Sequence, residues 1–240
     1  DDMEYEGQWK CDLMHGKGVF SYADDSEFDG LFVNNERQDG HGLMTYSEDG
    51  WLSADTVLGA LTEYEGEWKG EKFEGKGSVV LLNGDEFEGQ WQAGVRTDGA
   101  GTMTYAENGS VYTGQWLAGK WHGEGVLEDA ESGDKYSGQW TENAKTGKGI
   151  MNYANGDIYD GEWKQGRKTG EGKMSFENGD MYKGQFVDEK KIGVGTMHYG
   201  NGDVYEGQWD ANKKNGEGVL TRSNGQQEVG VWEKNSRKRK

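Results

Sequence analysis

The sequence predicts an all-β chain, an elongated single-sheet solenoid of antiparallel β-hairpins with one hairpin in each repeat of about 23 residues. Three observations support this prediction: a motif that recurs at fixed spacing, glycines at fixed positions within it, and the lack of proline. Glycine accounts for 42 of the 240 residues and proline for none. A continuous sheet uses every backbone N–H in its ladder, and proline has no N–H to donate.

The recurring motif is aromatic-x-Gly-x-aromatic, and a Gly-x-Gly pair follows nine or ten residues after its glycine. A fixed period of this size is typical of repeat arrays, in which each unit packs mainly on its neighbours. Nine full copies occur, and a degenerate tenth copy ends at Trp232. The full copies are Tyr5-Gly7-Trp9, Phe28-Gly30-Phe32, Tyr64-Gly66-Trp68, Phe87-Gly89-Trp91, Tyr112-Gly114-Trp116, Tyr136-Gly138-Trp140, Tyr159-Gly161-Trp163, Tyr182-Gly184-Phe186 and Tyr205-Gly207-Trp209.

Turn residues mark where each hairpin reverses. In residues 147–163, Asn155-Gly156 separates two alternating segments, which predicts a hairpin with a type I′ turn. Asn-Gly or Ser-Gly occupies the same place in the other copies that carry this signal. A polar link of five to eight residues is expected to join each hairpin to the next Gly-x-Gly.

Side chains alternate along a strand, so the repeat sorts its residues into columns. Tyr159, Gly161 and Trp163 share one face, and Asp160 and Glu162 point to the other. Over the whole array this predicts an aromatic column and, opposite it, a solvated Glu/Gln column. A third, apolar column is expected on the aromatic side or beneath the rings: Phe20, Met44, Val79, Met103, Leu127, Met151, Met174, Met197 and Leu220.

The array is predicted to span residues 1–233, and residues 234–240 form a basic tail. An insertion at about residues 49–63 separates the second and third copies. Its apolar residues are spaced as in a short amphipathic helix or an ordered lid. The insertion either caps the apolar surface of the array or contacts a partner. The basic tail is either a solvated end or a targeting or lipid-contacting segment. The apolar residues of the insertion are Trp51, Leu52, Val57, Leu58 and Leu61.

Charge and cysteine content limit the functional classes. The net charge of −18 argues against a nucleic-acid partner, because such affinity depends on neutralising phosphates. Membrane contact stays possible but is disfavoured by the same charge. Cys11 is the only cysteine, so the sequence offers no intramolecular disulfide and no cysteine-based metal site. The four histidines lie in separate repeats, and we expect no metal site and no cofactor.

The combination of Tyr-x-Gly-x-Trp, a Gly-x-Gly pair and Asn-Gly-Asp resembles the MORN repeat (membrane occupation and recognition nexus). The resemblance covers residues from about Tyr5 to Trp232. It implies a twisted array of antiparallel hairpins whose concave aromatic face forms a groove. Members of the family act as scaffolds in cytoskeletal, ciliary and cell-division structures, as partners of myosin tails, or as modules attached to other proteins. The resemblance identifies the fold more closely than the function.

We therefore expect an intracellular, non-catalytic protein-interaction scaffold in the cytoplasm, cytoskeleton or cilium, because no nucleophile, base and orienting group recur together. The alternatives are a membrane or phosphoinositide-associated module and a regulatory segment of a larger enzyme. The expected partner is a basic or amphipathic peptide held in an aromatic groove with acidic flanks, and the oligomeric state is left open. The candidate binding residues are Tyr112, Trp116, Tyr136, Trp140, Tyr159, Trp163, Tyr182, Tyr205, Glu124, Asp157, Asp160 and Glu171.

Overall fold

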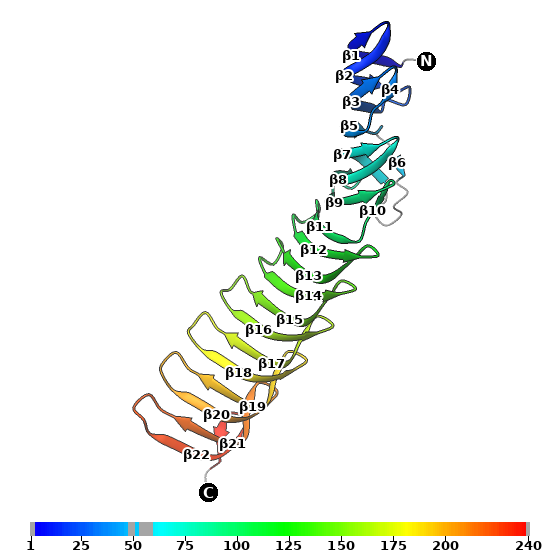
Figure 1. Ribbon diagram of the computed structural model, residues 1–240. Helices are drawn as coiled ribbons and strands as arrows, with labels where there is room; N and C mark the ends of the chain where they lie inside the picture. The colour runs from blue at the N-terminus through cyan, green and yellow to red at the C-terminus, as the bar shows by residue number, and fades with distance from the viewer. Residues whose placement is uncertain (1–2, 48–50, 53–59, 239–240) are drawn as a thin grey trace. The chain divides into compact units, whose positions relative to one another are not determined.

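The structure is a computed structural model that describes residues 3–47, 51–52 and 60–238. The chain divides into two compact units, residues 1–120 (unit 1) and 121–240 (unit 2). In both units the described residues form strands and turns without any helix (Figure 1). The prediction of an all-β chain of antiparallel hairpin repeats is confirmed. No helix in the described part of the chain is long and apolar enough to cross a membrane.

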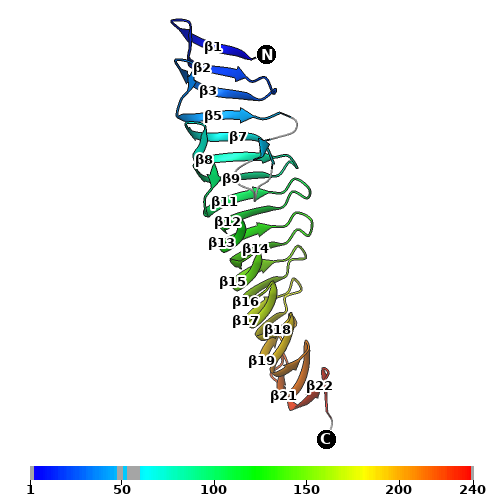
Figure 2. The ribbon, with the colours of Figure 1, turned by 90° about the vertical axis from the view of Figure 1, so that its right-hand side faces the viewer.

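The strands of unit 1 follow one another side by side in sequence order, and every pairing is antiparallel (Figure 2). The short strands β4, β6 and β10 pair with β3, β7 and β9. The bounds are β1 Glu4–Lys10, β2 Leu13–Ser21, β3 Glu27–Val33, β4 Glu36–Arg37, β5 Gly40–Thr45, β6 Trp51–Leu52, β7 Ala60–Lys69, β8 Lys72–Leu81, β9 Glu86–Gln92, β10 Val95–Arg96, β11 Gly99–Thr104 and β12 Val111–Leu117.

Unit 2 repeats the same ladder with greater regularity, because long strands alternate without interruption from β14 to β22. The bounds are β13 Lys120–Glu128, β14 Lys135–Thr141, β15 Ala144–Asn152, β16 Ile158–Lys164, β17 Arg167–Ser175, β18 Met181–Val187, β19 Lys190–His198, β20 Val204–Asp210, β21 Lys213–Thr221, β22 Gln227–Glu233 and β23 Ser236–Arg237. Strand β23, at the start of the basic tail, pairs with β22.

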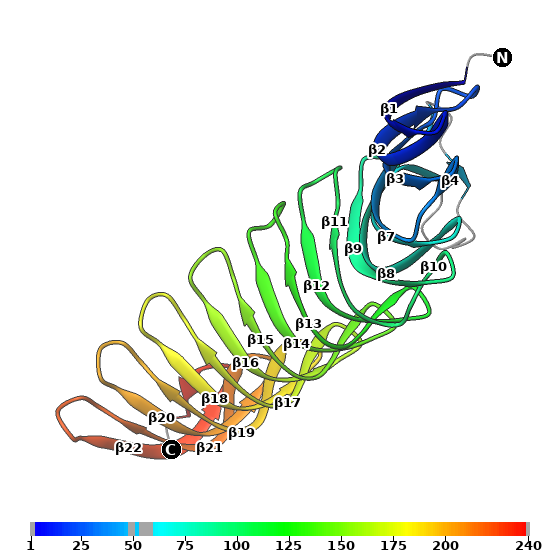
Figure 3. The ribbon, with the colours of Figure 1, turned by 45° about the horizontal axis from the view of Figure 1, so that its top comes forward.

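Each repeat bends where its ladder changes register. Between β16 and β17, Gly161 pairs with Gly172, but the next residue, Glu162, pairs with Thr169. The extra residues on β17 form a bulge, and a bulge bends and twists the strand that carries it. The same shift follows Gly138 in β14 and Gly184 in β18. The bent strands of unit 2 are visible in Figure 3.

A tyrosine ring fills the inside of each bend and explains the paired glycines. The Tyr159 hydroxyl donates a hydrogen bond to the carbonyl oxygen of Glu162 at 3.0 Å, so the ring lies across the backbone beyond its own position. A Cβ atom on Gly161 would lie 2.5 Å from the Tyr159 hydroxyl and 2.7 Å from Cα of Gly172. Only glycine leaves room for a ring at this distance from the backbone.

The tryptophan of each repeat links that repeat to the one before it. The indole N–H of Trp163 donates to the carbonyl oxygen of Gly149 at 3.0 Å, and Trp209 makes the same bond to Gly195. A buried indole N–H needs such a partner. The apolar column packs against these rings, as expected: Met151 and Met174 lie opposite Tyr159 on its two neighbouring strands and are buried.

The turn predicted at Asn155-Gly156 is present, but its type was wrong. A type I′ turn requires positive φ at both central residues. Here only Gly156 has it, with φ 90°, and the Gly156 N–H donates to the carbonyl oxygen of Tyr153. The loop therefore holds three residues, Ala154 to Gly156, and is closed by a bond from the Tyr153 N–H to the carbonyl oxygen of Asp157. This is the three-residue hairpin loop that ends in a left-handed glycine.

Tight two-residue turns occur instead at the opposite edge, within the predicted polar link. Gln165 and Gly166 have φ values of 50° and 78° and connect Lys164 to its strand partner Arg167. Positive φ at both central residues fits type I′. The link is therefore a second hairpin rather than a loop. The sequence signal was the Asn or Gly at the second turn position, as in Asn143, Asn212 and Gly166.

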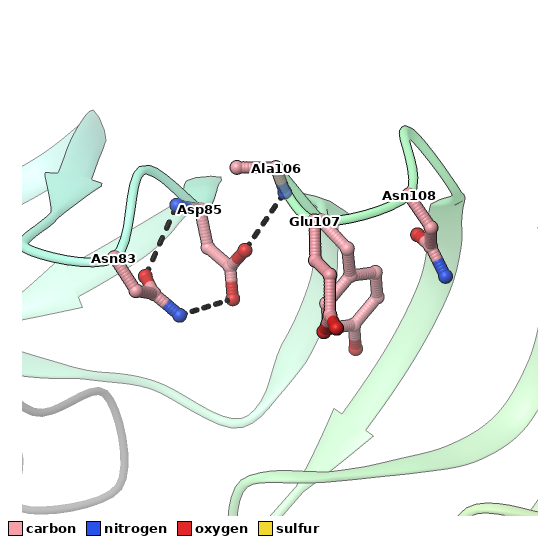
Figure 4. A pocket seen from close by; sticks show the side chains of 6 residues that line it. Asn83, Asp85, Ala106, Glu107 and Asn108 are labelled. Atoms are coloured by element: carbon pink, nitrogen blue, oxygen red, sulfur yellow. Dashed lines mark hydrogen bonds between the residues drawn. The ribbon is translucent and has the colours of Figure 1, made fainter.

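Side chains in the turns join neighbouring repeats at both edges. At the three-residue loops, Asp85 accepts a hydrogen bond from the backbone N–H of Ala106 at 2.8 Å (Figure 4). At the two-residue turns, the Asn212 side chain accepts from the Lys191 N–H at 2.8 Å. These bonds pair backbone groups that the ladder leaves open. The Asp85 contact recurs in unit 2 at Asp134, Asp157, Asp180 and Asp203.

The insertion contributes a short strand where an amphipathic helix was one expectation. Trp51 and Leu52 form β6 and lie opposite Leu61 and Ala60 of β7. Strand pairing takes precedence here because β7 begins four residues before Tyr64, and this extension pairs with β6. Val57 and Leu58 lie outside the described residues.

The bend geometry predicts that Gly161→Val destabilises the fold far more than Glu162→Ala. The added Cβ meets the Tyr159 ring and the Gly172 backbone, and overpacking of this kind typically costs about 1–3 kcal/mol. Glu162 accepts only a long bond of 3.4 Å from the Glu171 N–H, so its loss is expected to cost less than about 1 kcal/mol. Urea unfolding of the two variants measures the difference. Equal losses would contradict the face assignment.

Candidate functional site

We call the side of the sheet on which the tyrosine rings fill the bends the inner face. The aromatic residues that were predicted to line a groove form the buried core of this face. Tyr159 is 0% exposed and Trp163 4% exposed, and their rings meet edge to face with centroids 5.2 Å apart. Edge-to-face packing of this kind stabilises aromatic clusters. The other predicted rings are equally buried: Tyr112, Trp116, Tyr136, Trp140, Tyr182 and Tyr205. Their contact with a partner stays a prediction.

The predicted acidic residues do not flank these rings. Glu124, Asp160 and Glu171 are exposed and belong to the alternate positions of their strands, which face away from the rings. Asp160 and Glu171 line a shallow hollow on this outer face together with Lys148, Lys173 and Lys183. Asp157 lies in a turn, where its carboxylate accepts the Glu177 N–H at 2.9 Å. The sequence reasoning grouped all four with the rings, although the strand alternation already put Asp160 on the opposite face.

A column of lysines on the inner face was missed from the sequence. In each repeat, the residue directly opposite the Trp or Phe that ends the motif lies at the start of the next strand. In unit 2 this residue is a lysine in four successive repeats, 23 residues apart. The four residues, called the lysine column below, are Lys145, Lys168, Lys191 and Lys214.

The ammonium groups of the lysine column lie over aromatic rings. Nζ of Lys191 is 5.1 Å from the ring centroid of Tyr182 and 5.3 Å from that of Trp209. Nζ of Lys214 is 4.7 Å from the ring of Trp232. Such cation–π contacts are worth about 0.5–1 kcal/mol each at exposed sites and more when water is excluded. All four lysines are half-buried, which is typical of long side chains that cover apolar surface with their aliphatic stems.

Burial weakens the hold of most of these lysines on their protons. Loss of hydration lowers the pKa of Lys145, Lys191 and Lys214 from the ordinary value of 10.5. Burial acts on Lys168 as well, but hydrogen bonds to Tyr153 and Glu189 outweigh it and raise its pKa. Lys168 also pairs with the Glu189 carboxylate at 3.0 Å. Within the described residues, the other three ammoniums have no carboxylate within the 4.0 Å of an ion pair.

Unit 1 has a different inner face. The positions that match the lysine column hold Met14, Arg37, Phe73 and Arg96. Arg37 lies 4.6 Å from the Phe28 ring and pairs with Glu71. Arg37 and Phe73 line an open, mainly apolar hollow of about 760 Å³. Its walls include Tyr22, Met44, Tyr46 and Trp68.

The acidic charge of the chain is concentrated in unit 1. Residues 1–120 carry a formal charge of −16 and residues 121–240 a charge of −2, which together give the −18 of the whole chain. The excess negative charge of the chain therefore belongs to unit 1. In unit 2 acidic and basic groups are nearly balanced, and the basic ones include the lysine column.

No cluster of three or more His, Cys, Asp or Glu residues that could hold a metal ion occurs among the described residues. The aspartates after the turns recur with the hairpins and accept backbone N–H groups of the next turn. Their repetition and their backbone bonds explain them as structural residues.

The chain belongs to the MORN repeat family. The family profile matches eight segments, which together cover more than half of the sequence: 5–27, 64–86, 87–110, 112–132, 136–158, 159–181, 182–204 and 205–227. The copy at Phe28-Gly30-Phe32 is outside these matches, yet it forms the same pairing, with Gly18 opposite Gly30. Substitution of Tyr and Trp by Phe at its two ends accounts for the weaker sequence signal.

Among curated proteins, the chain is similar to the alsins of mouse and human. It is 30% identical to each over 123 residues, which is 50% of this chain and 7% of the alsin sequence. The chain thus matches only a small part of the length of these relatives.

Among solved structures, the chain is similar to the TCP domain of Drosophila melanogaster SAS-4 in complex with a proline-rich motif of Ana2. The TM-score is 0.44 and the identity is 18%, and the match covers 66% of this chain and 84% of that one. The chain is also similar to the TCP10 domain of Danio rerio CPAP in complex with a STIL peptide, with a TM-score of 0.36 and 8% identity over 95% of this chain and 100% of that one. Likeness at these scores does not extend to function.

The lysine contacts predict different costs for two matched substitutions. Lys168→Met removes an ammonium that is bonded to Tyr153 and Glu189, whereas Lys191→Met removes one without such partners. Methionine keeps the stem over the rings in both cases. We expect Lys168→Met to lower the free energy of unfolding by about 1 kcal/mol more than Lys191→Met. Chemical denaturation at neutral pH measures both, and the reverse order would show that the bonds to Lys168 are not stabilising.

The buried tyrosines predict loss of stability in base. Burial raises the pKa of Tyr136, Tyr159 and Tyr182 above the ordinary value of 10.0, and that of Tyr205 to about 12. Because the folded values are raised, their contribution is complete below pH 10 and is lost as the pH rises through the folded values. The unfolding free energy should therefore fall with pH above 10. Tyr205→Phe should flatten this slope, and an unchanged slope would contradict the assignment.

Proposed function

We propose that this chain is a non-catalytic protein-interaction scaffold that acts inside the cell, in a cytoskeletal or ciliary assembly, and holds a segment of a partner protein. The observation that carries the proposal is the inner face of unit 2, where half-buried lysines and rings recur in register over four repeats. Solenoid arrays use such continuous faces for recognition. We propose residues 1–233 as the array and 234–240 as its basic tail.

The chemistry of the inner face supports binding rather than catalysis. Its ionisable groups are repeated, and a catalytic pair should be singular. The aromatic hydroxyls are used within the fold, since Tyr159, Tyr182 and Tyr205 each donate to a backbone carbonyl. A regulatory role within a larger enzyme is compatible with the same surface.

The sequence predicted a basic or amphipathic peptide as the partner. The carboxylates of this chain that could pair with such a peptide lie on the outer face of unit 2 or on unit 1. On the outer face of unit 2, three carboxylates and three lysines line one hollow: Asp160, Glu162, Glu171, Lys148, Lys173 and Lys183. This balance gives a strongly basic segment little net attraction there. The acidic unit 1, whose apolar hollow adjoins Asp24 and Glu71, suits an amphipathic basic segment better.

Association with anionic membranes or phosphoinositides is the second candidate, and the lysine column is the observation that favours it. Each basic residue near an anionic surface is worth about 1 kcal/mol, but the carboxylates of unit 1 oppose contact. A bilayer is also nearly flat, while these ammoniums lie inside the bend of each repeat.

Affinity capture on the intact chain tests the proposal. Cys11 is the only cysteine and is exposed, so the chain can be immobilised through one defined thiol at its N-terminal end. We expect specific proteins to be retained and to be released by rising salt, because screening weakens charge pairs. A heat-unfolded sample of the same chain is the control for non-specific retention.

Co-sedimentation with vesicles that contain phosphatidylserine or phosphoinositide runs in parallel. Retention of lipid with no retained protein would show that the scaffold proposal is wrong and that the membrane candidate is correct.

A further inference from the structure

We propose that the lysine column of unit 2 binds an extended acidic segment of a partner protein, whose carboxylates pair with Lys145, Lys191 and Lys214. This inference rests on the proposed scaffold function and names the chemistry of its partner. It differs from the basic partner expected from the sequence, because that expectation placed carboxylates beside the rings, where the structure has lysines.

The first observation is that the column has unused capacity for ion pairing. Lys145, Lys191 and Lys214 are half-buried over aromatic rings and have no carboxylate within ion-pair distance among the described residues. A half-buried charge without a partner is costly, and a carboxylate brought by a partner would reduce that cost. Lys145 and Lys191 also each feel the like charge of Lys168 between them, and bound carboxylates would screen this repulsion.

The aspartates nearest to the column are already used within the fold. Asp134, Asp180 and Asp203 are close enough to act on the charges of Lys145, Lys191 and Lys214. Their carboxylates accept the backbone N–H groups of Ala154, Gly200 and Ser223 in the next turn at 2.8–2.9 Å. They therefore orient the turns and leave the ammoniums available.

The second observation is the period of the column. Two strands separate one lysine from the next, which corresponds to about 10 Å along the sheet. A polyproline II segment is extended and completes a turn in three residues, or about 9 Å, so its side chains at every third position point the same way. An acidic side chain at every third position of such a segment would therefore meet successive lysines, whereas positions three apart in a β-strand point to opposite faces. A helix, at 1.5 Å per residue, would need an acidic residue about every seventh position.

The third observation is that half-buried rings alternate with the ammoniums. Nζ of Lys168 lies 5.2 Å from the Tyr153 ring, that of Lys191 5.0 Å from the Phe176 ring, and that of Lys214 5.5 Å from the Tyr199 ring. These three rings are half-buried, in contrast to the fully buried Tyr159 column. In the partner segment, the residues between two acidic side chains could pack on these rings. The site therefore combines charge pairing with apolar contact area.

The experiment uses the full chain and a labelled synthetic peptide of four Glu-Ala-Ser triplets, with binding measured by fluorescence anisotropy at low salt. The control peptide has the same composition, but its four glutamates are contiguous. We expect the evenly spaced peptide to bind about fivefold or more tightly than the clustered one, because only even spacing lets each carboxylate reach one lysine. Equal affinity would overturn the proposed register, and no binding of either peptide would overturn the site.

Two triple variants of equal charge change separate the column from general electrostatics. The inner variant is Lys145→Gln, Lys191→Gln and Lys214→Gln; the outer variant is Lys148→Gln, Lys173→Gln and Lys183→Gln. We expect the inner variant to bind the spaced peptide about tenfold more weakly and the outer variant to stay within about threefold of the parent chain. If both variants lost the same affinity for the spaced peptide, binding would depend only on net charge, and the proposal would be overturned.

A third triple variant, Lys145→Arg, Lys191→Arg and Lys214→Arg, keeps the positive charge at these positions and is the control for a folding defect. It should restore binding to within about threefold, and circular dichroism of all variants should match that of the parent. If phosphatidylserine vesicles bind in a column-dependent way while the spaced peptide does not, the site belongs to a membrane and the peptide proposal fails. If the peptide fails but affinity capture still retains proteins, the scaffold function stands without this site.

Discussion

The fold depends on the close packing of one tyrosine ring against two glycines at the bend of each repeat. The ring of Tyr159 lies directly over Gly161 and Gly172 and reaches the carbonyl oxygen of Glu162. Because this contact fills the inside of the bend, the strand ends can fold inward and bring the Trp of the motif opposite the first residues of the next strand. The rings, the apolar column and the lysines are all positioned by that bend.

Much of this arrangement could be predicted from the sequence because it repeats. A fixed period, glycines at constant phase and strict alternation identified the hairpins, the paired faces and the buried column that contains Met151 and Met174. The turn types could not be predicted in the same way. Asn155-Gly156 fits two loop geometries, and backbone bonds around Tyr153 and Asp157 select the longer one. At the other edge, Glu142-Asn143 adopts positive φ without any glycine, because the Asn143 side chain also bonds to the N–H of Trp121.

The candidate site was harder to predict than the fold. Abundant Tyr and Trp suggested an exposed aromatic groove, but Tyr159 and Tyr205 are 0% exposed because the bend closes over them. Once these rings form the core, the next layer of residues forms the surface that we propose for recognition. That layer begins with the lysines opposite Trp140, Trp163 and Trp209. The signal was present as a lysine at constant phase, but its meaning depends on a cross-strand pairing that the sequence alone does not reveal.

The division of charge between the units gives the two halves of the array different recognition chemistry. Unit 1 carries nearly all of the excess acid and has Met14, Arg37, Phe73 and Arg96 at the column positions, so its inner face combines apolar contact with two arginines. Unit 2 has almost no net charge and an unbroken row of four lysines. A single partner segment with uniform charge would suit one unit and be repelled or ignored by the other. If the proposed scaffold function holds for each unit separately, a basic segment suits unit 1 and an acidic segment suits unit 2.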